Sequence, residues 1–206
     1  MRRLILQMQM SVDGVVESSA RGMGWQLWDW SARCPWDDSL RTHFNEAVCS
    51  ADTILLSRNM LEQGYLAHSA RIASVTDGDA LFAFSRHMLG MKKVVVTRKR
   101  SLQEWSGVDV RRGPLREIVP GLKQTEGGDI ICFGGTGFAS ALIADGLVDE
   151  LQFFINPAAV GRGRSLFGNV DHCARMKLID AQGYGCGVVV VRYSPEGRRE
   201  VASRAA

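Results

Sequence analysis

The feature that most constrains this chain is an alternation of short, strongly apolar runs with segments whose apolar residues recur at helical spacing. Short β-rich runs predict buried strands, and apolar residues three or four positions apart predict amphipathic helices. The predicted strands are residues 4–10, 52–57, 92–97 and 129–134, then 150–160, 176–181 and 188–193 with no helix between them. The predicted helices are residues 37–49, a segment capped by Asp79, residues 114–123, which Pro120 should kink or shorten, and residues 136–145.

This order of elements predicts an α/β fold. Strand–helix alternation implies right-handed crossovers between parallel strands, whereas a terminal run of strands implies an antiparallel edge. We therefore expect a three-layer α/β/α architecture with a mixed, mainly parallel sheet and antiparallel C-terminal strands. A length of 206 residues fits one domain. We expect residues 1–194 to form it and the polar residues 195–206 to be a tail.

Composition excludes several classes of protein. Apolar residues make up 46% of the chain, charged residues 23%, and the net charge is only +3, which argues against disorder and against nucleic-acid binding. The five cysteines have no C-x-x-C spacing and the four histidines are scattered, so no metal site is expected. No run approaches the roughly 20 apolar residues of a membrane span, and the N-terminus is typical of a strand rather than a signal peptide. We expect a cytoplasmic protein with reduced thiols and a small-molecule substrate.

The strand ends carry the functional information, because ligands of such sheets bind beyond the carboxyl ends of the strands. The sequence Gly-Gly-Thr-Gly-Phe follows one predicted strand and opens a helix, where free N–H groups attract a phosphate and glycines allow close approach. The predicted cofactor cradle is Gly134, Gly135, Thr136, Gly137 and Phe138. A glycine turn required only by packing is the alternative.

Two other strand ends carry hydroxyl and cationic groups. Ser57 and Arg58 follow one strand, and Thr97 and Arg98 close another. Cations and hydroxyls from separate strands suit a terminal phosphate monoester. If the glycine turn holds a pyrophosphate, these residues could hold the 2′-phosphate of NADPH. Taken alone, Arg98 is better explained as part of a solvated basic loop than as a phosphate ligand. For Arg58 the two explanations are equally good.

Five stretches together carry a resemblance to a known family. They are residues 10–14, 52–58, 94–98, 129–137 and 146–167. In their order the chain resembles the dihydrofolate reductase-like superfamily, in particular the group containing the reductase domain of the riboflavin-biosynthesis deaminase–reductase. Each motif is weak alone, but the series extends over most of the chain.

The resemblance implies an NADPH-dependent reductase of the 5-amino-6-(5-phosphoribosylamino)uracil reductase type, acting on a heterocyclic or ribosylamino substrate, and a homodimer. Gly134-Gly135 would match the family's double glycine, which a cis peptide often joins. Asp13 would match the acid of the family's S-x-D-G turn. The chain departs from the family pattern at Ser57, where a glycine is usual, and at Met60, where a threonine often follows.

Candidates for catalysis and substrate binding are less defined. The candidate catalytic acids are Asp13 and either Asp38 or its neighbour Asp37. Asp13 could instead belong to a tight turn, and Asp37 and Asp38 could instead be acids that stabilise a helix N-terminus. Trp28 lies in a tryptophan-rich stretch that could stack a planar heterocycle, cap the core or form an interface. Arg162 and Arg164 could bind a substrate phosphate or be solvated residues of a turn.

Two alternative functions remain open at this stage. A dihydrofolate reductase-type pterin reductase would require a buried acid at position 37 or 38. A protein that binds NADPH without turnover is the other alternative, which the departures at Ser57 and Met60 leave open.

Overall fold

The fold is built on one mixed sheet, seen in a computed structural model that describes residues 1–19, 24–27, 35–99, 105–170 and 173–196. The eight strands of this sheet lie in the order β5-β4-β3-β6-β1-β7-β10-β9. The first six are parallel, whereas β10 is antiparallel to both β7 and β9. The predicted mainly parallel sheet with antiparallel C-terminal strands is confirmed.

The strands of the main sheet are β1 (Leu4–Ser11), β3 (Ala51–Ser57), β4 (Lys92–Thr97), β5 (Val108–Arg112), β6 (Asp129–Cys132), β7 (Glu150–Asn156), β9 (Met176–Gly183) and β10 (Val189–Pro195). A separate antiparallel pair is formed by β2 (Val15–Ser18) and β8 (Gly163–Ser165). The helices are α1 (Asp38–Cys49), α2 (Arg58–Glu62), α3 (Tyr65–Val75), the 3₁₀ turn η1 (Ala80–Phe82), α4 (Ala83–Gly90), α5 (Leu115–Lys123) and α6 (Thr136–Ala144).

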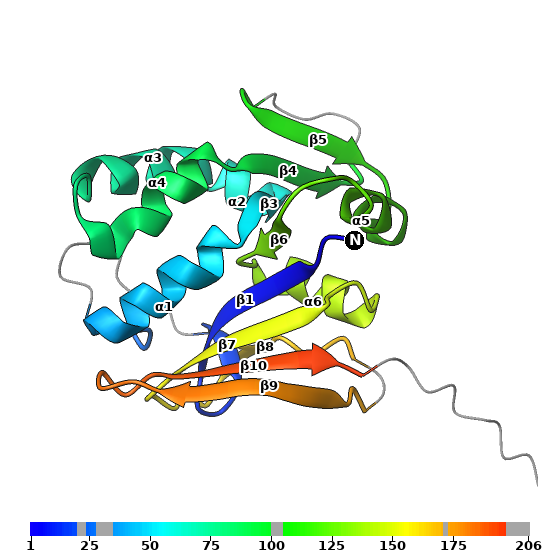
Figure 1. Ribbon diagram of the computed structural model, residues 1–206. Coiled ribbons are helices and arrows are strands. Elements are labelled where there is room, and N and C mark those ends of the chain that lie inside the picture. The colour runs from blue at the N-terminus through cyan, green and yellow to red at the C-terminus, as the bar shows by residue number, and fades with distance from the viewer. Residues whose placement is uncertain (20–23, 28–34, 100–104, 171–172, 197–206) are drawn as a thin grey trace, which may run out of the picture.

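Helices cover both faces of the sheet, which confirms the three-layer architecture (Figure 1). Successive residues of a strand point to opposite faces, and β3 shows this clearly. Leu55 packs in the core shared with α5 and α6, whereas Ile54 and Leu56 pack in the core shared with α1 and α4. The alternation of apolar residues in the sequence therefore supplies two cores from the same strands.

Helix α1 illustrates how the sequence sets an element's position. Leu40, Phe44 and Val48 are buried along one side, as the helical spacing predicts. The Asp37 carboxylate caps the helix, accepting a hydrogen bond of 2.9 Å from the Leu40 N–H. Trp36 is buried just before this cap and stacks on Phe154, so this tryptophan belongs to the core.

The structure corrects several predicted boundaries. The strand expected to reach residue 160 ends at Asn156, because Pro157 follows and has no N–H to donate. The strand expected to reach residue 134 ends at Cys132, and Gly134 has a positive φ of 111°. Pro120 lies inside α5 and does not shorten it. The C-terminal tail begins later than predicted, because Pro195 still belongs to β10, and residues 197–206 lie outside the described part.

Other elements were not predicted from the sequence. They are α2, α3, β5, and β8 with its pairing to β2. The segment capped by Asp79 begins as the 3₁₀ turn η1 and becomes helical only at Ala83. Phe82 is the buried residue of that turn.

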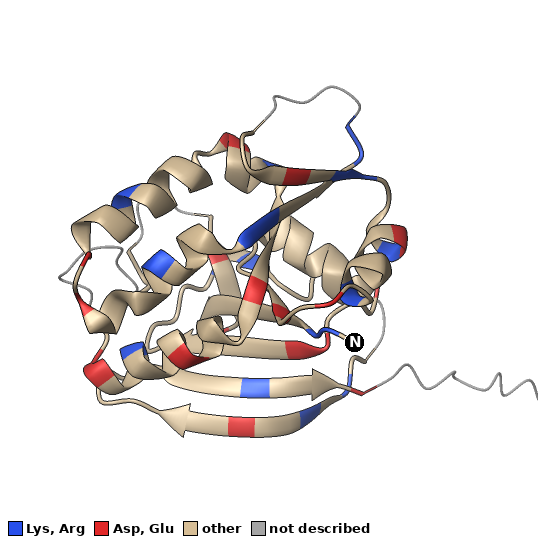
Figure 2. Cartoon of the chain, turned by 45° about the horizontal axis from the view of Figure 1, so that its top comes forward, with Lys and Arg blue, Asp and Glu red and all other residues tan. Residues whose placement is uncertain are grey.

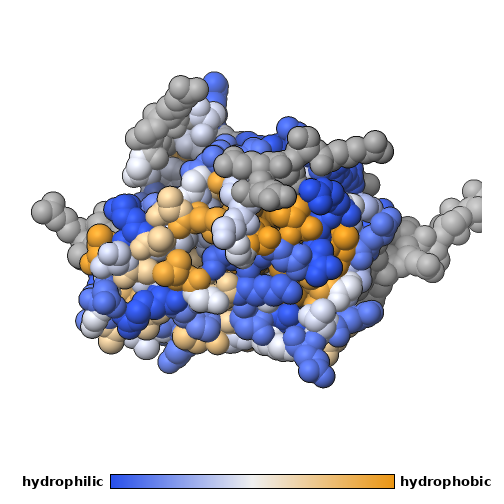
Figure 3. Space-filling model, turned by 90° about the horizontal axis from the view of Figure 1, so that it is seen from above, coloured by the Kyte–Doolittle hydropathy of each residue, from blue (hydrophilic) through white to orange (hydrophobic). Residues whose placement is uncertain are grey.

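The surface of the described chain is mixed in character. Acidic and basic residues are interspersed over the helices and strands (Figure 2). Viewed from above, hydrophobic side chains gather in the middle of the face between hydrophilic ones (Figure 3). None of the helices in the described part combines the length and the apolar character that crossing a lipid bilayer requires.

Candidate active site

One large cavity, of about 800 Å³, brings together residues from distant parts of the chain. The β2–β8 pair, the end of β3 with α2, and the start of α6 with the residue before it contribute Val16, Glu17, Ser57, Asn59, Met60, Gly135, Thr136, Gly137, Phe138 and Arg164. From β1, the α1, α3 and α4 helices and the segments beside them it receives Gln7, Met8, Gln9, Gln26, Phe44, Gln63, Tyr65, His68, Met88 and Phe133. A volume of this size suits a cofactor or drug-sized ligand.

Part of the cavity wall is the glycine turn, through Gly135, Thr136 and Gly137. A cis peptide bond joins Gly134 and Gly135, which is the feature that the family resemblance implies. A Cβ on Gly134 would lie 3.2 Å from the Met8 sulfur, so this residue is packed against β1. A Cβ on Gly135 would meet nothing within 4 Å. The backbone is therefore fixed on one side and open to the cavity on the other.

Helix α6 begins directly at this turn with its N-terminus facing the cavity. Gly135 is the N-cap, no side chain caps the helix, and its first turn contains no acidic residue. The positive end of the helix dipole is thus available to an anion in the cavity. Gly135, Thr136 and Gly137 fit a phosphate group, because the backbone there is open and uncapped.

The Ser57 strand end lies at the same cavity. Its hydroxyl accepts a 3.3 Å hydrogen bond from the Met60 N–H and so caps α2. Ser57 and Asn59 both line the cavity, and Arg58 lies between them at the first position of α2. The Arg58 guanidinium pairs with Glu62 one turn later and donates to the Asn59 side chain at 3.1 Å. The start of α2 and the glycine turn thus share one cavity, while Arg58 itself is held by protein groups.

Thr97 and Arg98 lie on the same edge of the sheet but outside the cavity lining. Val96 is the register partner of Ser57, so the ends of β3 and β4 are neighbours. Thr97 is buried and its hydroxyl accepts a bond from the Lys99 N–H, whereas Arg98 is exposed. A role for Thr97 and Arg98 in phosphate binding remains a proposal.

Asp13 holds a loop together rather than facing the cavity. Its carboxylate accepts hydrogen bonds from the Ser11 hydroxyl at 2.6 Å and from the Val160 and Gly161 N–H groups at 3.0 and 2.6 Å. The Ser11 hydroxyl first, then the two backbone amides, lower the pKa of Asp13 to about 2. Both carboxylate oxygens are engaged within this loop and Asp13 does not line the cavity, so the geometry does not support Asp13 as the proton donor.

Asp37 and Asp38 are also placed as structural acids. Asp38 is exposed in the first turn of α1. The hydroxyl of Ser39, followed by the backbone N–H of Leu40, lowers the pKa of Asp37 to about 2. Neither carboxyl lines the cavity, so the structure does not support the prediction of a catalytic acid at these positions.

The proposed substrate-binding residues separate into different environments. Arg164 lines the cavity beside the glycine turn and pairs with Glu17 at 3.3 Å. Arg162 is exposed, and its carbonyl accepts bonds from Ser19. Trp28 lies outside the described residues. The structure thus brings Arg164, predicted to contact substrate, to the predicted cofactor cradle.

Sequence reasoning missed several groups that line the cavity, above all Glu17, Tyr65 and His68. Tyr65 and His68 lie three residues apart on α3, at the spacing that places side chains on one helical face. Burial raises the pKa of Tyr65 to about 12, which keeps its hydroxyl protonated. The buried positions Ser69, Ile72 and Ala73 repeat at helical spacing and were the available signal for this helix.

The comparisons with known proteins agree with this arrangement. Residues 2–190 match the family model of the RibD C-terminal domain. The chain belongs to this family. The uncharacterized protein YyaP of Bacillus subtilis (strain 168), a curated relative, is 26% identical over 196 residues, which are 95% of this chain and 96% of YyaP. The predicted resemblance to the reductase domain of the deaminase–reductase is thereby confirmed.

Solved structures confirm the dihydrofolate reductase-like fold of this RibD C-terminal domain. The deaminase/5-amino-6-(5-phosphoribosylamino)uracil reductase of Thermotoga maritima superposes with a TM-score of 0.66 at 14% identity, over 95% of this chain and 57% of that chain. Dihydrofolate reductase of Enterococcus faecalis, complexed with NADP(H), superposes with a TM-score of 0.55 at 15% identity, over 94% of this chain and 96% of that chain.

Proposed function

We propose that the protein is an NADPH-dependent reductase of the 5-amino-6-(5-phosphoribosylamino)uracil reductase type, acting on a heterocyclic or ribosylamino substrate. The observation that carries this proposal is the single cavity into which the glycine turn, the start of α2 and strand β1 all open. Membership in the RibD C-terminal domain family supports a reductase. The reductase name of the Thermotoga maritima relative supports the substrate class.

The residues present fit a dinucleotide cofactor at one part of the cavity. Gly135, Thr136 and Gly137 would hold its pyrophosphate at the uncapped start of α6. Arg58, Thr97 and Arg98 would hold the 2′-phosphate, which distinguishes NADPH from NADH. When bound, the cofactor supplies a hydride to the acceptor carbon, and the protein's task is to orient the partners and exclude water.

The other part of the cavity suits a planar polar acceptor. Phe44 and Phe133 offer aromatic surface, and Gln9 and Gln26 offer amide groups that donate and accept hydrogen bonds. Tyr65 and His68 carry exchangeable protons on this wall. We propose that one of these two side chains supplies the proton that accompanies hydride transfer.

The test is to titrate the protein with NADPH and with NADH while following nicotinamide fluorescence. NADPH should bind more tightly, because only it carries the 2′-phosphate. Oxidation of NADPH should then be measured against a panel of pyrimidine, ribosylaminopyrimidine and pterin acceptors. Equal affinity for the two cofactors, or binding of neither, would contradict the proposal.

Two alternatives are separated by the same measurements. A dihydrofolate reductase-type activity is supported by the fold of the Enterococcus faecalis enzyme, and inhibition by antifolates would reveal it. Its required acid at position 37 or 38 does not line the cavity, which weakens this alternative. NADPH binding without oxidation of any acceptor in the panel would instead indicate a binding protein without turnover.

We also propose that the protein forms a homodimer through the antiparallel edge of the sheet. Strand β9 is the edge strand, and Leu178 and Ile179 on it are 53% and 46% exposed. An open strand edge with exposed apolar side chains favours association with another chain. Light scattering after size-exclusion chromatography should give twice the mass of one chain, and a monomeric mass would contradict the proposal.

A further inference from the structure

A carboxylate lies at the predicted phosphate cradle, bound to the Thr136 hydroxyl. Glu17, on β2, accepts a hydrogen bond of 3.0 Å from the Thr136 hydroxyl at the first position of α6. The same carboxylate oxygen pairs with Arg164 at 3.3 Å. Glu17 and Arg164 are cross-strand neighbours in the β2–β8 pair, and all three side chains line the cavity.

The surroundings of Glu17 are positive. Helix α6 presents its uncapped N-terminus there, with no acidic residue of its own in the first turn. A second guanidinium nitrogen of Arg164 lies 3.3 Å from the position that a Cβ of Gly137 would take. Glu17 therefore supplies, from another strand, the negative charge that this helix end and Arg164 attract.

This ion pair is poorly suited to a purely structural role. The Glu17 and Arg164 side chains are 52% and 62% exposed, and exposed ion pairs contribute little to stability. Exposed side chains can also change conformation without disturbing the core. Glu17 is therefore able to leave the cradle while the fold stays intact.

We propose that Glu17 is a displaceable anion, which holds Thr136 and Arg164 until the phosphates of the cofactor replace it; this inference rests on the proposed function. A pyrophosphate and a carboxylate repel each other and compete for the same donors. Binding therefore releases Arg164 from Glu17 to a phosphate oxygen and moves the carboxylate towards solvent. Glu17 accordingly weakens cofactor affinity and makes it sensitive to salt.

The test compares the wild-type protein with Glu17→Gln, which keeps an oxygen for the Thr136 hydroxyl and removes the charge. Inorganic pyrophosphate and NADPH are titrated separately by calorimetry at constant low ionic strength. Both should bind about fivefold more tightly to the variant, because the exposed Glu17–Arg164 ion pair no longer has to be broken before the phosphates bind. The gain should shrink in high salt. Glu126→Gln is the matched control, an exposed glutamate beside the amino ends of the strands.

The outcomes separate this inference from the proposed function. Tighter binding of pyrophosphate to Glu17→Gln, with no NADPH binding by either protein, would support the displaceable anion and contradict the NADPH-dependent function. Binding of NADPH to both proteins with unchanged or weakened affinity in Glu17→Gln would contradict this inference alone. A gain for NADPH without a gain for pyrophosphate would also contradict it. Binding of neither ligand to either protein would contradict both.

Discussion

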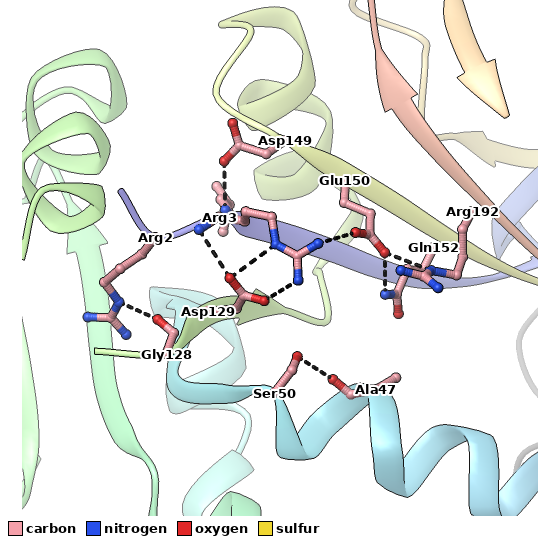
Figure 4. A network of polar contacts seen from close by, with 11 residues as sticks. Arg2, Arg3, Ala47, Ser50, Gly128, Asp129, Asp149, Glu150, Gln152 and Arg192 are labelled. Carbon is pink, nitrogen blue, oxygen red and sulfur yellow. Dashed lines mark hydrogen bonds and ion pairs between the residues drawn. The ribbon is translucent and has the colours of Figure 1, made fainter. Parts of the chain in front are cut away.

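The two ends of the parallel sheet use charged residues in opposite ways. At the amino ends, Glu150 is only 2% exposed and accepts bonds from Arg3 at 2.9 Å and Arg192 at 2.8 Å (Figure 4). Arg3 also pairs with Asp129, so cations and carboxylates neutralise one another across β1, β6, β7 and β10. These charges bind strands together.

At the carboxyl ends, hydrogen-bonding groups face a cavity instead. The strand ends there carry glycine, serine and threonine, and the start of α6 has no capping side chain. The Glu17–Arg164 pair at this end is exposed, unlike the Glu150 cluster. The charges at the amino ends of the strands therefore serve stability, and the groups at the carboxyl ends serve binding. Substitutions at the amino ends should change the free energy of unfolding, and substitutions at the carboxyl ends should change cofactor affinity.

The largest effect is expected at the amino ends. Glu150→Ala should lower the free energy of unfolding by about 3 kcal/mol, because it leaves the Arg3 and Arg192 guanidiniums without their shared carboxylate. Partial exposure of both arginines keeps the effect at the low end of the range for buried pairs. Urea denaturation measures this change.

The control for Glu150→Ala is an exposed ion pair elsewhere on the molecule. Asp77→Ala removes the partner of Arg86 and should cost less than about 1 kcal/mol. The Glu150→Ala protein, where still folded, should bind NADPH as the wild type does. If the Glu150→Ala protein lost cofactor affinity at a temperature where it is folded, this would contradict the division of roles between the amino and carboxyl ends of the strands.

The next largest effect is expected at the glycine turn. A methyl group at position 135 would project into open space, so Gly135→Ala should leave the free energy of unfolding within about 0.5 kcal/mol of wild type. The same methyl would occupy part of the cradle and weaken NADPH binding by about tenfold, or about 1.4 kcal/mol. Fluorescence titration and urea denaturation give the two numbers.

Gly121→Ala is the matched control, since a Cβ there also meets nothing within 4 Å but lies on α5. It should leave NADPH affinity unchanged. Equal affinities of the Gly135→Ala and wild-type proteins would show that the cofactor does not contact this turn.

The sequence predicted most strands of the sheet because each buried strand is a short continuous run of apolar residues. Runs such as Val94-Val95-Val96 have no other stable place than the middle of a two-faced sheet. It predicted α6 and its glycine turn for the same reason, since the signals lie within a few residues. Helices α2 and α3 were missed because α2 starts at Arg58 directly after β3, with no intervening loop, and because α3 is rich in small and polar residues.

The site was only partly predictable because its contacts are long-range. Glu17 meets Thr136 only after β2 has paired with β8, and no local pattern encodes that pairing. The Arg58–Glu62 pair, by contrast, has the i, i+4 spacing of a helical ion pair. A correct prediction of α2 would have been enough to predict this contact. The roles assigned to Asp13 and Asp37 depended on hydrogen-bond partners that only the folded chain reveals.

A smaller effect is expected at Arg58, whose guanidinium already has protein partners. Arg58→Ala should lower the preference for NADPH over NADH by about 1 kcal/mol, less than the roughly 1.5–3 kcal/mol of a bond to a charged group, because Glu62 and Asn59 already hold the guanidinium. Glu62→Gln should have the opposite sign, because it frees Arg58 for the 2′-phosphate. The ratio of the two dissociation constants is the measurement. A preference that neither variant changes would exclude Arg58 from the cofactor site.

The smallest effect is expected at Asp37, which tests whether the acids at the carboxyl edge are structural. Asp37→Ala should cost about 0.5–1 kcal/mol at pH 7 and leave NADPH binding unchanged, because Asp37 caps α1 outside the cavity.

The folded pKa of about 2 lies below the unfolded value near 3.9, so the ionised carboxylate stabilises the fold above pH 4 to 5, and this contribution is lost as the pH falls towards 2. Urea denaturation from pH 7 to pH 3 should therefore show the wild type and Asp37→Ala converging, whereas Asp37→Asn, which keeps the accepting oxygen for the Leu40 N–H, should lie between them at pH 7. A difference that stays constant down to pH 3 would contradict stabilisation by the ionised carboxylate, and a loss of NADPH affinity in Asp37→Ala would return Asp37 to the list of catalytic candidates.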